Sequence, residues 1–206
     1  MKDFIFIFDL DSTISKVEIL PEIAKYMGKE SEIRKLTEDT MQGLIPFKYS
    51  FLNRVKILSP KKVSEVNEIV SNIPLNEEIV KFIQKHKERC YIVTGNLDVW
   101  IDGLMKKIGM KNHCFCSKTM VKNDYIEKVV SVIDKGLQVE QFVQPFVVIG
   151  DGDNDAEMAR LSDIGIGFGA VRHIAPALLN NIDYAFYDED KLVEFLEKLA
   201  EETTNG

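Results

Sequence analysis

The feature that most constrains this chain is a series of short, continuous apolar runs separated by stretches with helical periodicity. An apolar run without polar alternation is typical of a strand buried on both faces, as in a parallel sheet. The apolar runs occupy residues 4–8, 90–93, 146–149, 182–187 and, more weakly, 164–168. The helical patterns between or after them occupy residues 77–86, 97–108, 153–161 and 189–200. Strands that alternate with helices predict an α/β fold with a doubly wound, mostly parallel sheet.

Residues 15–75 interrupt this alternation. They show helical periodicity but no convincing strand, in four segments: 17–27, 30–42, 47–57 and 61–72. The simplest interpretation is a small helical cap inserted after the first strand, over the sheet edge where ligands bind in open α/β folds. We therefore expect an α/β core domain of residues 1–14 and 76–206 and a helical cap domain of residues 15–75. Residues 113–126 fit either a hairpin or an irregular connection.

The charge balance limits the kinds of partner. The 206-residue chain has a formal net charge of -7, which argues against nucleic acid or an anionic membrane as the main partner. Its three cysteines are too few to describe a disulfide framework. The first apolar run is too short to span a bilayer and lacks a signal peptide's cleavage site. We expect a cytoplasmic protein, monomeric or homodimeric, that acts on a small molecule.

An acidic pair directly follows the first apolar run. Asp9 and Asp11 are two residues apart, so two carboxylates facing one cleft would repel each other unless a proton or a cation offsets the repulsion. Mg²⁺ suits such a site because it prefers hard oxygen ligands and tolerates phosphate. One carboxylate can also attack phosphorus while the other transfers protons. A solvated turn at the end of a strand is the alternative.

A second acidic cluster follows the run at residues 146–149. It reads Gly-Asp-Gly-Asp-Asn-Asp over residues 150–155, with too many polar side chains for a buried strand. An EF-hand loop starting at Asp151 would need Glu at its twelfth position, and Ser162 is there instead. The cluster therefore favours a magnesium site at the end of a strand.

A third polar cluster follows the run at residues 90–93. It consists of Thr94, Gly95 and Asn96, just before a helical pattern. A hydroxyl group and free backbone N–H groups at a helix N-terminus can hold a phosphate, although an ordinary helix cap has the same composition. Such a site also needs a cation. Lys128, which opens the helical stretch before the strand ending at Asp151, is one candidate, with Lys118 and Lys122 as competitors.

Together, these clusters resemble the motifs of the haloacid dehalogenase superfamily of phosphatases. The first motif, D-x-D-x-[TV], and the fourth, G-D-x-x-x-D, are the most specific. The four motifs are matched in order by Asp9, Asp11 and Thr13; by Thr94; by Lys128; and by Gly150, Asp151 and Asp155. The resemblance implies a Mg²⁺-dependent phosphatase that forms an aspartyl phosphate.

The resemblance also implies a role for each matched residue. Asp9 would be the nucleophile, and Asp11 the general acid and base. The implied metal ligands are Asp9, Asp11 through its backbone carbonyl, Asp151 and the supporting Asp155. Asp155 would orient Lys128, with Asn154 close to the phosphate. Dehalogenases resemble this layout but lack the second aspartate of the first motif, so Asp11 favours phosphoryl chemistry.

Within the superfamily, the sequence is most similar to the phosphoserine phosphatases. Glu18 falls where that family places an acid near the substrate ammonium group. Phe47 and Arg54 fall where it places an apolar lid residue and the arginine that binds the substrate carboxylate. Asn96 and Asp153 depart from the family pattern, which has Gly and Ala there. Phosphoserine is therefore the first candidate substrate; another small phosphorylated metabolite, or phosphotransfer to an alcohol, is the alternative.

Overall fold

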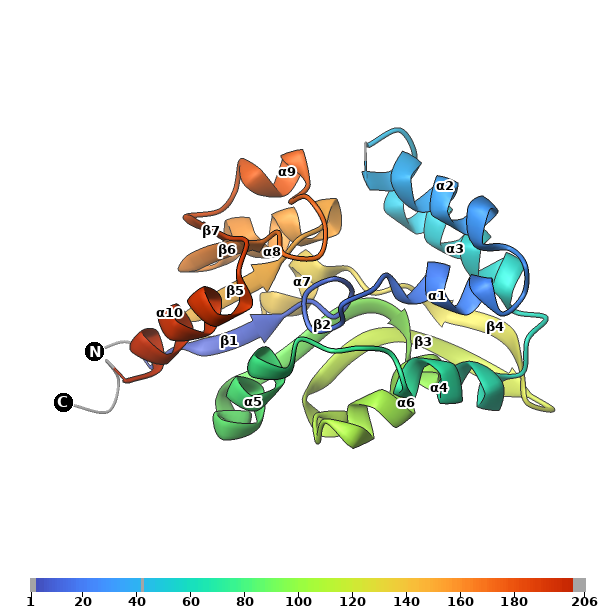
Figure 1. The fold of residues 1–206 in the computed structure, drawn as a ribbon, viewed down its shortest axis with the longest axis horizontal. Helices are drawn as coiled ribbons and strands as arrows, with labels where there is room; N and C mark the ends of the chain where they lie inside the picture. The colour runs from blue at the N-terminus through green and yellow to red at the C-terminus, as the bar shows by residue number, and fades with distance from the viewer. Residues whose placement is uncertain (1–2, 42, 202–206) are drawn as a thin grey trace.

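The computed structural model describes residues 3–41 and 43–201 of the chain. Within those residues, seven strands form one sheet in the order β4-β3-β2-β1-β5-β6-β7 (Figure 1). All neighbouring strands are parallel except β3 and β4, which are antiparallel. The strands are β1 Ile5–Phe8, β2 Cys90–Leu97, β3 Cys114–Lys122, β4 Tyr125–Ser131, β5 Phe146–Gly150, β6 Ile164–Phe168 and β7 Tyr184–Phe186. The doubly wound, mostly parallel α/β fold expected from the sequence is confirmed.

The centre of the sheet sets the position of the site. Strand β1 pairs with β2 on one side and with β5 on the other, and all four of its residues are buried. The register places Phe8 opposite Ile92 of β2 and Ile149 of β5, so β1 and β5 end side by side, while β2 continues to Leu97. In open α/β folds, ligands bind outside the carboxyl ends of the strands, at the point where the strand order reverses direction. Strand β1, with β2 on one side and β5 on the other, lies at that point.

Alternate residues of β1 pack into two different apolar layers. Phe6 and Phe8 face a layer that includes residues of α5, α6 and α10, and the Phe6 ring meets the Phe82 ring edge-on at 5.1 Å. Ile5 and Ile7 face a layer that includes residues of α7, α8 and α9. The helices are α5 Glu77–Lys85, α6 Asp98–Lys107, α7 Lys135–Val139, α8 Ala156–Leu161, α9 Pro176–Leu179 and α10 Glu189–Glu201. Short 3-10 turns are η1 Lys87–Arg89, η2 Lys111–His113 and η3 Asp153–Asp155.

The segment after β1 is helical, as its periodicity predicts. Its helices are α1 Ile19–Lys25, α2 Glu30–Met41, α3 Phe47–Leu58 and α4 Val63–Ser71, and α2 and α3 lie together away from the sheet (Figure 1). The two connections to the sheet run side by side, because the Lys16 amide donates to the Pro74 carbonyl and the Asn76 amide donates to the Ile14 carbonyl, both at 2.9 Å. Helix α4 packs against α6 and is hydrogen-bonded at its start to the β3–β4 turn, because Ser64 Oγ donates to the Asp124 carboxylate.

The region that the sequence left open is an antiparallel hairpin. Asn123 and Asp124 form its turn with φ of 50° and 67°, the left-handed conformation that short hairpin turns require. The hairpin extends to Ser131, beyond the segment considered from the sequence. Lys128 was expected to open a helix but lies in the middle of strand β4, because the residues after the turn pair with β3. Among the described residues, no helix has the length and apolar character needed to cross a membrane.

Candidate active site

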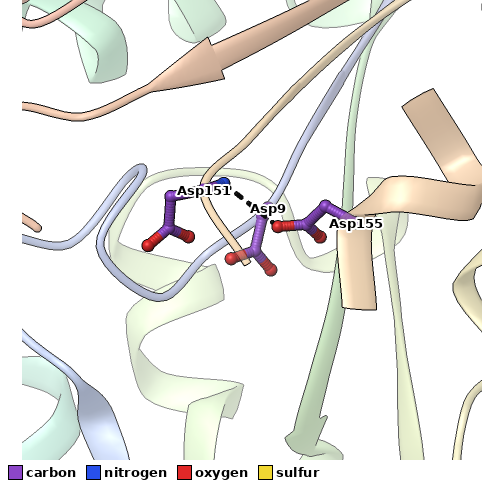
Figure 2. Close-up of side chains that lie close together, drawn as sticks. All are labelled: Asp9, Asp151 and Asp155. Atoms are coloured by element: carbon purple, nitrogen blue, oxygen red, sulfur yellow. Dashed lines mark hydrogen bonds between the residues drawn. The ribbon is translucent and has the colours of Figure 1, made fainter. Parts of the chain in front are cut away.

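Three buried carboxylates meet where β1 and β5 end. Asp9 directly follows β1, and its amide donates to the Ile149 carbonyl of β5 at 2.8 Å. Asp151 and Asp155 follow β5, and one carboxylate oxygen from each of the three residues lies within 4.8 Å of the others (Figure 2). All three side chains are buried. The pairing of the two strands is therefore what brings together residues 142 positions apart in the sequence.

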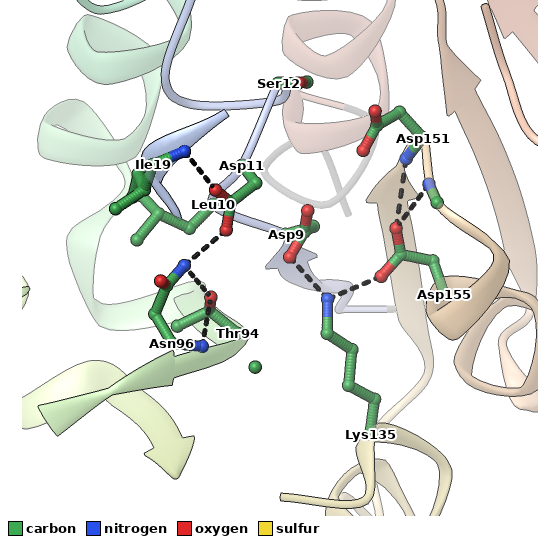
Figure 3. Close-up of polar contacts among 12 residues, drawn as sticks. Asp9, Leu10, Asp11, Ser12, Ile19, Thr94, Asn96, Lys135, Asp151 and Asp155 are labelled. Atoms are coloured by element: carbon green, nitrogen blue, oxygen red, sulfur yellow. Dashed lines mark hydrogen bonds and ion pairs between the residues drawn. The ribbon is translucent and has the colours of Figure 1, made fainter. Parts of the chain in front are cut away.

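The Asp151 loop is held by Asp155. One Asp155 oxygen accepts hydrogen bonds from the backbone amides of Asp151, at 3.1 Å, and Gly152, at 2.9 Å (Figure 3). The strand must end in Gly150, because a Cβ atom there would lie 2.6 Å from the Asp155 carboxyl carbon. These contacts leave Asp151 Oδ1 buried without a hydrogen-bond partner among the described residues.

Lys135, at the start of α7, supplies the cation of this cluster. Its ammonium group contacts Asp9 Oδ1 and lies 2.7 Å from Asp155 Oδ1, and the side chain is buried (Figure 3). Lys128 and Lys118 are exposed residues of the β3–β4 hairpin, and Lys118 contacts Cys116 instead. The structure thus corrects the expectation for Lys128: Lys135 is the lysine beside the acidic residues.

Burial and mutual repulsion make the charged form of the cluster costly. Burial, followed by the charge of Asp155, raises the pKa of Asp9 well above its usual value, and Lys135 counteracts part of this rise. Burial raises the pKa of Asp151 to about 8, despite the opposing charge of Arg172. The pKa of Lys135 is itself raised, because the charges of Asp155 and Asp9 outweigh the effect of its burial. Lys135 and Arg172 carry two positive charges beside three carboxylates, so the cluster favours a further cation.

The residues present fit a hard divalent metal ion. The donors of Asp9, Asp151 and Asp155 are all oxygen, which Mg²⁺ and Ca²⁺ prefer over nitrogen or sulfur. The unpartnered Asp151 Oδ1 is a buried acceptor that a bound cation would satisfy. Asp11 is expected to bind the metal through its backbone carbonyl, and its side chain points away from the three carboxylates.

The Asp11 carboxylate faces the first helix of the insertion and the end of β2. It accepts a hydrogen bond from the Ile19 amide at 2.8 Å and another from the side-chain amide of Asn96 (Figure 3). Burial, followed by the negative charge of Glu18, raises its pKa to about 6. Asp11 is therefore a carboxyl group that can gain or lose a proton near neutral pH, close to but distinct from Asp9.

The end of β2 supplies the polar group predicted around Thr94. Asn96 donates through its backbone and its side chain to Thr94 Oγ1, both at 3.2 Å, while Asn96 Oδ1 has no partner among the described residues. The Phe47 ring, at the start of α3, lies over Gly95, since a Cβ atom on that glycine would be 2.6 Å from the ring. The helical insertion therefore touches the end of β2 at the point where the site begins.

A pocket extends from the acidic cluster toward the helical insertion. Nearly all the residues expected to bind the substrate line this pocket, together with others that the sequence did not indicate. The lining residues are Asp9, Asp11, Glu18, Leu20, Thr37, Thr40, Phe47, Phe51, Arg54, Gly95, Asn96, Asp153, Asn154 and Arg172. The Arg54 guanidinium is buried and donates to Thr37 Oγ1 at 2.9 Å. Among the described residues, no carboxylate lies within ion-pair distance of this guanidinium and its Nε has no hydrogen-bond partner.

Two cationic residues of the site, Lys135 and Arg172, were not predicted from the sequence. Lys135 follows Asp134, which caps α7 through its side chain, and nothing in the local pattern distinguishes it from other surface lysines. Arg172 lies between β6 and α9 and contacts both Glu18 and Asp151. Both residues reach the site only through the folding of the chain, so a local motif does not mark them.

Comparison with known proteins agrees with this geometry. The family model of haloacid dehalogenase-like hydrolases matches residues 6–160. A phosphoserine phosphatase of Methanocaldococcus jannaschii is 27% identical over 82% of this chain and 87% of its own. One of Archaeoglobus fulgidus is 30% identical over 80% of this chain, which spans only 52% of that relative. A solved structure of a substrate-bound phosphoserine phosphatase complex is 26% identical, with a TM-score of 0.81 over 96% of this chain and 99% of the other.

The matched family region begins in β1 and ends in α8, so it contains Asp9, Asp11, Asp151 and Asp155. The chain belongs to the haloacid dehalogenase-like hydrolases and is a phosphatase most similar to the phosphoserine phosphatases.

Proposed function

We propose that the chain hydrolyses O-phosphoserine to serine and inorganic phosphate in two steps, with Asp9 as the phosphorylated residue and Mg²⁺ as the metal. The observation that carries the proposal is the placement of Asp9 between Lys135 and a second acid, Asp11, at the mouth of a pocket with a buried arginine, Arg54, that has no described carboxylate within ion-pair distance. Each part of this arrangement has a chemical task.

In the first step, an Asp9 carboxylate oxygen attacks phosphorus. The new bond joins Asp9 to the phosphoryl group, and the ester bond to the serine oxygen breaks. Asp11 gives its proton to that leaving oxygen. A pKa of about 6 suits this task, because an appreciable fraction of Asp11 is protonated near neutral pH while its conjugate base remains a useful proton acceptor.

In the second step, a water molecule attacks phosphorus and releases Asp9. Asp11, now ionised, takes a proton from the water as the new P–O bond forms. The aspartyl–phosphate bond breaks and its electron pair returns to Asp9. Lys135 remains in contact with Asp9 throughout, where its charge balances the negative charge of the transferring phosphoryl group.

The three clustered carboxylates are the proposed metal site. When bound, Mg²⁺ would neutralise charge on the phosphoryl oxygens. Asp9 and Asp151 would hold it directly, with Asp155 supporting the loop of Asp151. We also propose that the Asp11 backbone carbonyl contributes, as the motif implies.

The pocket beyond the cluster is the proposed site of the serine moiety. The Arg54 guanidinium is buried, has unused donors, and would bind the substrate carboxylate. Glu18 is the acid in the same pocket that would face the substrate ammonium group, with Phe47 covering the site from α3. Thr94, Asn96 and Asn154 would surround the phosphate. We propose residues 15–75 as the cap domain that carries the specificity residues.

Phosphate release distinguishes this function from its alternatives. A panel of phosphoserine, phosphothreonine, phosphoethanolamine, glycerol phosphate and sugar phosphates is assayed with Mg²⁺ and with EDTA. We expect Mg²⁺-dependent release that is fastest with phosphoserine and absent in Asp9→Asn. Equal rates on phosphoserine and on sugar phosphates would indicate a different small phosphomonoester. Loss of phosphoserine without equivalent free phosphate, in the presence of an acceptor alcohol, would indicate phosphotransfer.

A further inference from the structure

Arg172 makes contacts in the pocket that the mechanism above does not use. It comes from the loop between β6 and α9, and its side chain is half-buried. Its Nη1 contacts Glu18 Oε1 and its Nε contacts Asp151 Oδ2. The pKa of Arg172 is raised above its usual value, because the charges of Asp151 and Glu18 outweigh the effect of burial. Because a guanidinium stays protonated in proteins, Arg172 places a positive charge inside the substrate pocket.

Glu18 is already occupied by this arginine. Its Oε1 also accepts a hydrogen bond from Ser12 Oγ at 3.1 Å. A carboxylate that is paired with a guanidinium and a hydroxyl group offers less to an incoming ammonium group than a free one does. An ammonium group bound there would also be repelled by Arg172 itself.

The charges around the far end of the pocket favour an anion. The ionisable groups that act on Arg54 are Glu18, Asp11 and Arg172, and burial is the largest cause of its lowered pKa. Glu18 and Asp151 pair with Arg172, whereas Arg54 has no described carboxylate within ion-pair distance at the end that would hold the substrate's organic part. A single carboxylate on the substrate fits this balance better than a carboxylate and an ammonium group together.

We propose that Arg172 is a specificity-determining residue that opens the site to phosphate esters of small hydroxycarboxylic acids, which have the carboxylate of phosphoserine but no ammonium group. The inference rests on the proposed function, because it uses the same phosphate site and the same arginine, Arg54. It extends the substrate class beyond phosphorylated amino acids.

A second role of Arg172, in orienting Asp151, has to be separated from specificity. That contact would affect the metal site and so change the turnover of every substrate by the same factor. The ratio of kcat/KM for two substrates that share the phosphate and differ only at the amino group cancels such a common factor. The suitable pair is O-phosphoserine and 3-phosphonooxypropanoate, its deamino analogue.

The ratio of kcat/KM for phosphoserine to that for the deamino analogue is measured in the wild type, in Arg172→Gln and in Arg172→Lys. We expect a wild-type ratio within about threefold of unity and a rise of about tenfold in Arg172→Gln, as the Coulomb energy between unit charges in a partly exposed pocket suggests. Arg172→Lys keeps the charge and should stay near the wild-type ratio. The control Arg34→Gln removes a guanidinium that pairs with Glu30 on the surface, and should leave the ratio unchanged.

The wild-type ratio tests the proposal even where a variant does not fold. A preference for phosphoserine of a hundredfold or more would overturn the role of Arg172 while leaving the proposed function intact, as would an unchanged ratio in folded Arg172→Gln. Release of phosphate from neither compound would overturn the proposed function as well. Dissociation constants of both compounds on Asp9→Asn, measured by calorimetry, should show the same ratio without turnover.

Discussion

Replacing Lys135 by methionine removes the cation that contacts both Asp9 and Asp155 while keeping most of the side chain's volume. The lysine is buried, and its ammonium group lies 2.7 Å from Asp155. Removing one partner of a buried charge pair costs roughly 3–5 kcal/mol, because the remaining charge is left without compensation. We expect the free energy of unfolding of the metal-free protein to fall at neutral pH by less than that amount, because Asp9 takes up a proton more readily once the lysine charge is gone.

The same change should impair turnover. Lys135 opposes the rise in the pKa of Asp9, so its loss leaves Asp9 more often protonated and less nucleophilic. It also removes a positive charge from the transferring phosphoryl group, and losing one such stabilising group typically lowers kcat by roughly 10²–10³. We expect kcat for phosphoserine to fall at least that far.

Lys128→Met is the matched control, because Lys128 is an exposed lysine of strand β4. Both variants are assayed for kcat and KM with saturating Mg²⁺, and for unfolding in urea. We expect Lys128→Met to retain wild-type activity and to change the unfolding free energy by no more than about 0.5 kcal/mol. Inactivation by Lys128→Met, with full activity in Lys135→Met, would refute the assignment of the cation.

Three further changes test other parts of the site. Arg54→Met should raise KM for phosphoserine by about 10–100-fold, which corresponds to the loss of a hydrogen bond to a charged group. Phosphoethanolamine has no carboxylate, so its KM should stay within about threefold of the wild-type value. Equal effects on both substrates would show that Arg54 does not bind the substrate carboxylate. Gly95→Ala should raise KM for all substrates by about tenfold and lower the thermal midpoint by a few degrees. The reason is that the added Cβ would lie 2.6 Å from the Phe47 ring unless that ring moves. A wild-type KM together with a wild-type thermal midpoint would show that the ring is not held there. Asp151 has a pKa of about 8 when folded and an unfolded reference of 3.8, so the folded chain keeps a proton that the unfolded chain loses between those pH values. The metal-free protein should therefore lose a few kcal/mol of stability as pH rises from about 4 to 8, and Mg²⁺ should raise the thermal midpoint more at pH 8 than at pH 5.5; a Mg²⁺ effect that is larger at pH 5.5 would contradict the raised pKa.

The parts of the site that the sequence predicts are those encoded by short local patterns. Asp9 and Asp151 each follow a continuous apolar run, and a buried parallel strand ends where such a run ends. Because both strands are parallel neighbours, their ends meet, and the carboxylates meet with them. Asp155 is only four residues from Asp151, so the same turn brings it back to the loop.

The cations were harder to predict because tertiary structure alone selects them. Lys128 and Lys135 are seven residues apart, and the choice depends on where the hairpin ends. After the turn at Asn123 and Asp124, the second strand of the hairpin continues to Ser131. The chain then returns to the end of the sheet where the site lies, and Lys135 begins α7 there. A hairpin ending at residue 126 would have left Lys128 as the first candidate.

The helices of the insertion were predicted well, but its apolar contacts with the core were not. Apolar periodicity locates α2 and α3 to within a residue or so. The same pattern does not reveal that the apolar residues of the insertion and of one face of the sheet form a continuous layer. Nor does it reveal that Arg172, from a loop after β6, faces Glu18 across the pocket. Contacts between elements far apart in the sequence leave no periodic signal.

The central claim is that Asp9 itself carries the phosphoryl group during turnover. Enzyme mixed with phosphoserine labelled in its phosphate is quenched in acid within one turnover, digested and mapped by mass spectrometry. We expect the label on the peptide containing Asp9, in an acyl phosphate that hydroxylamine removes, and its absence in Asp9→Asn. Rapid phosphate release without any labelled peptide, or a label on another residue, would contradict the account.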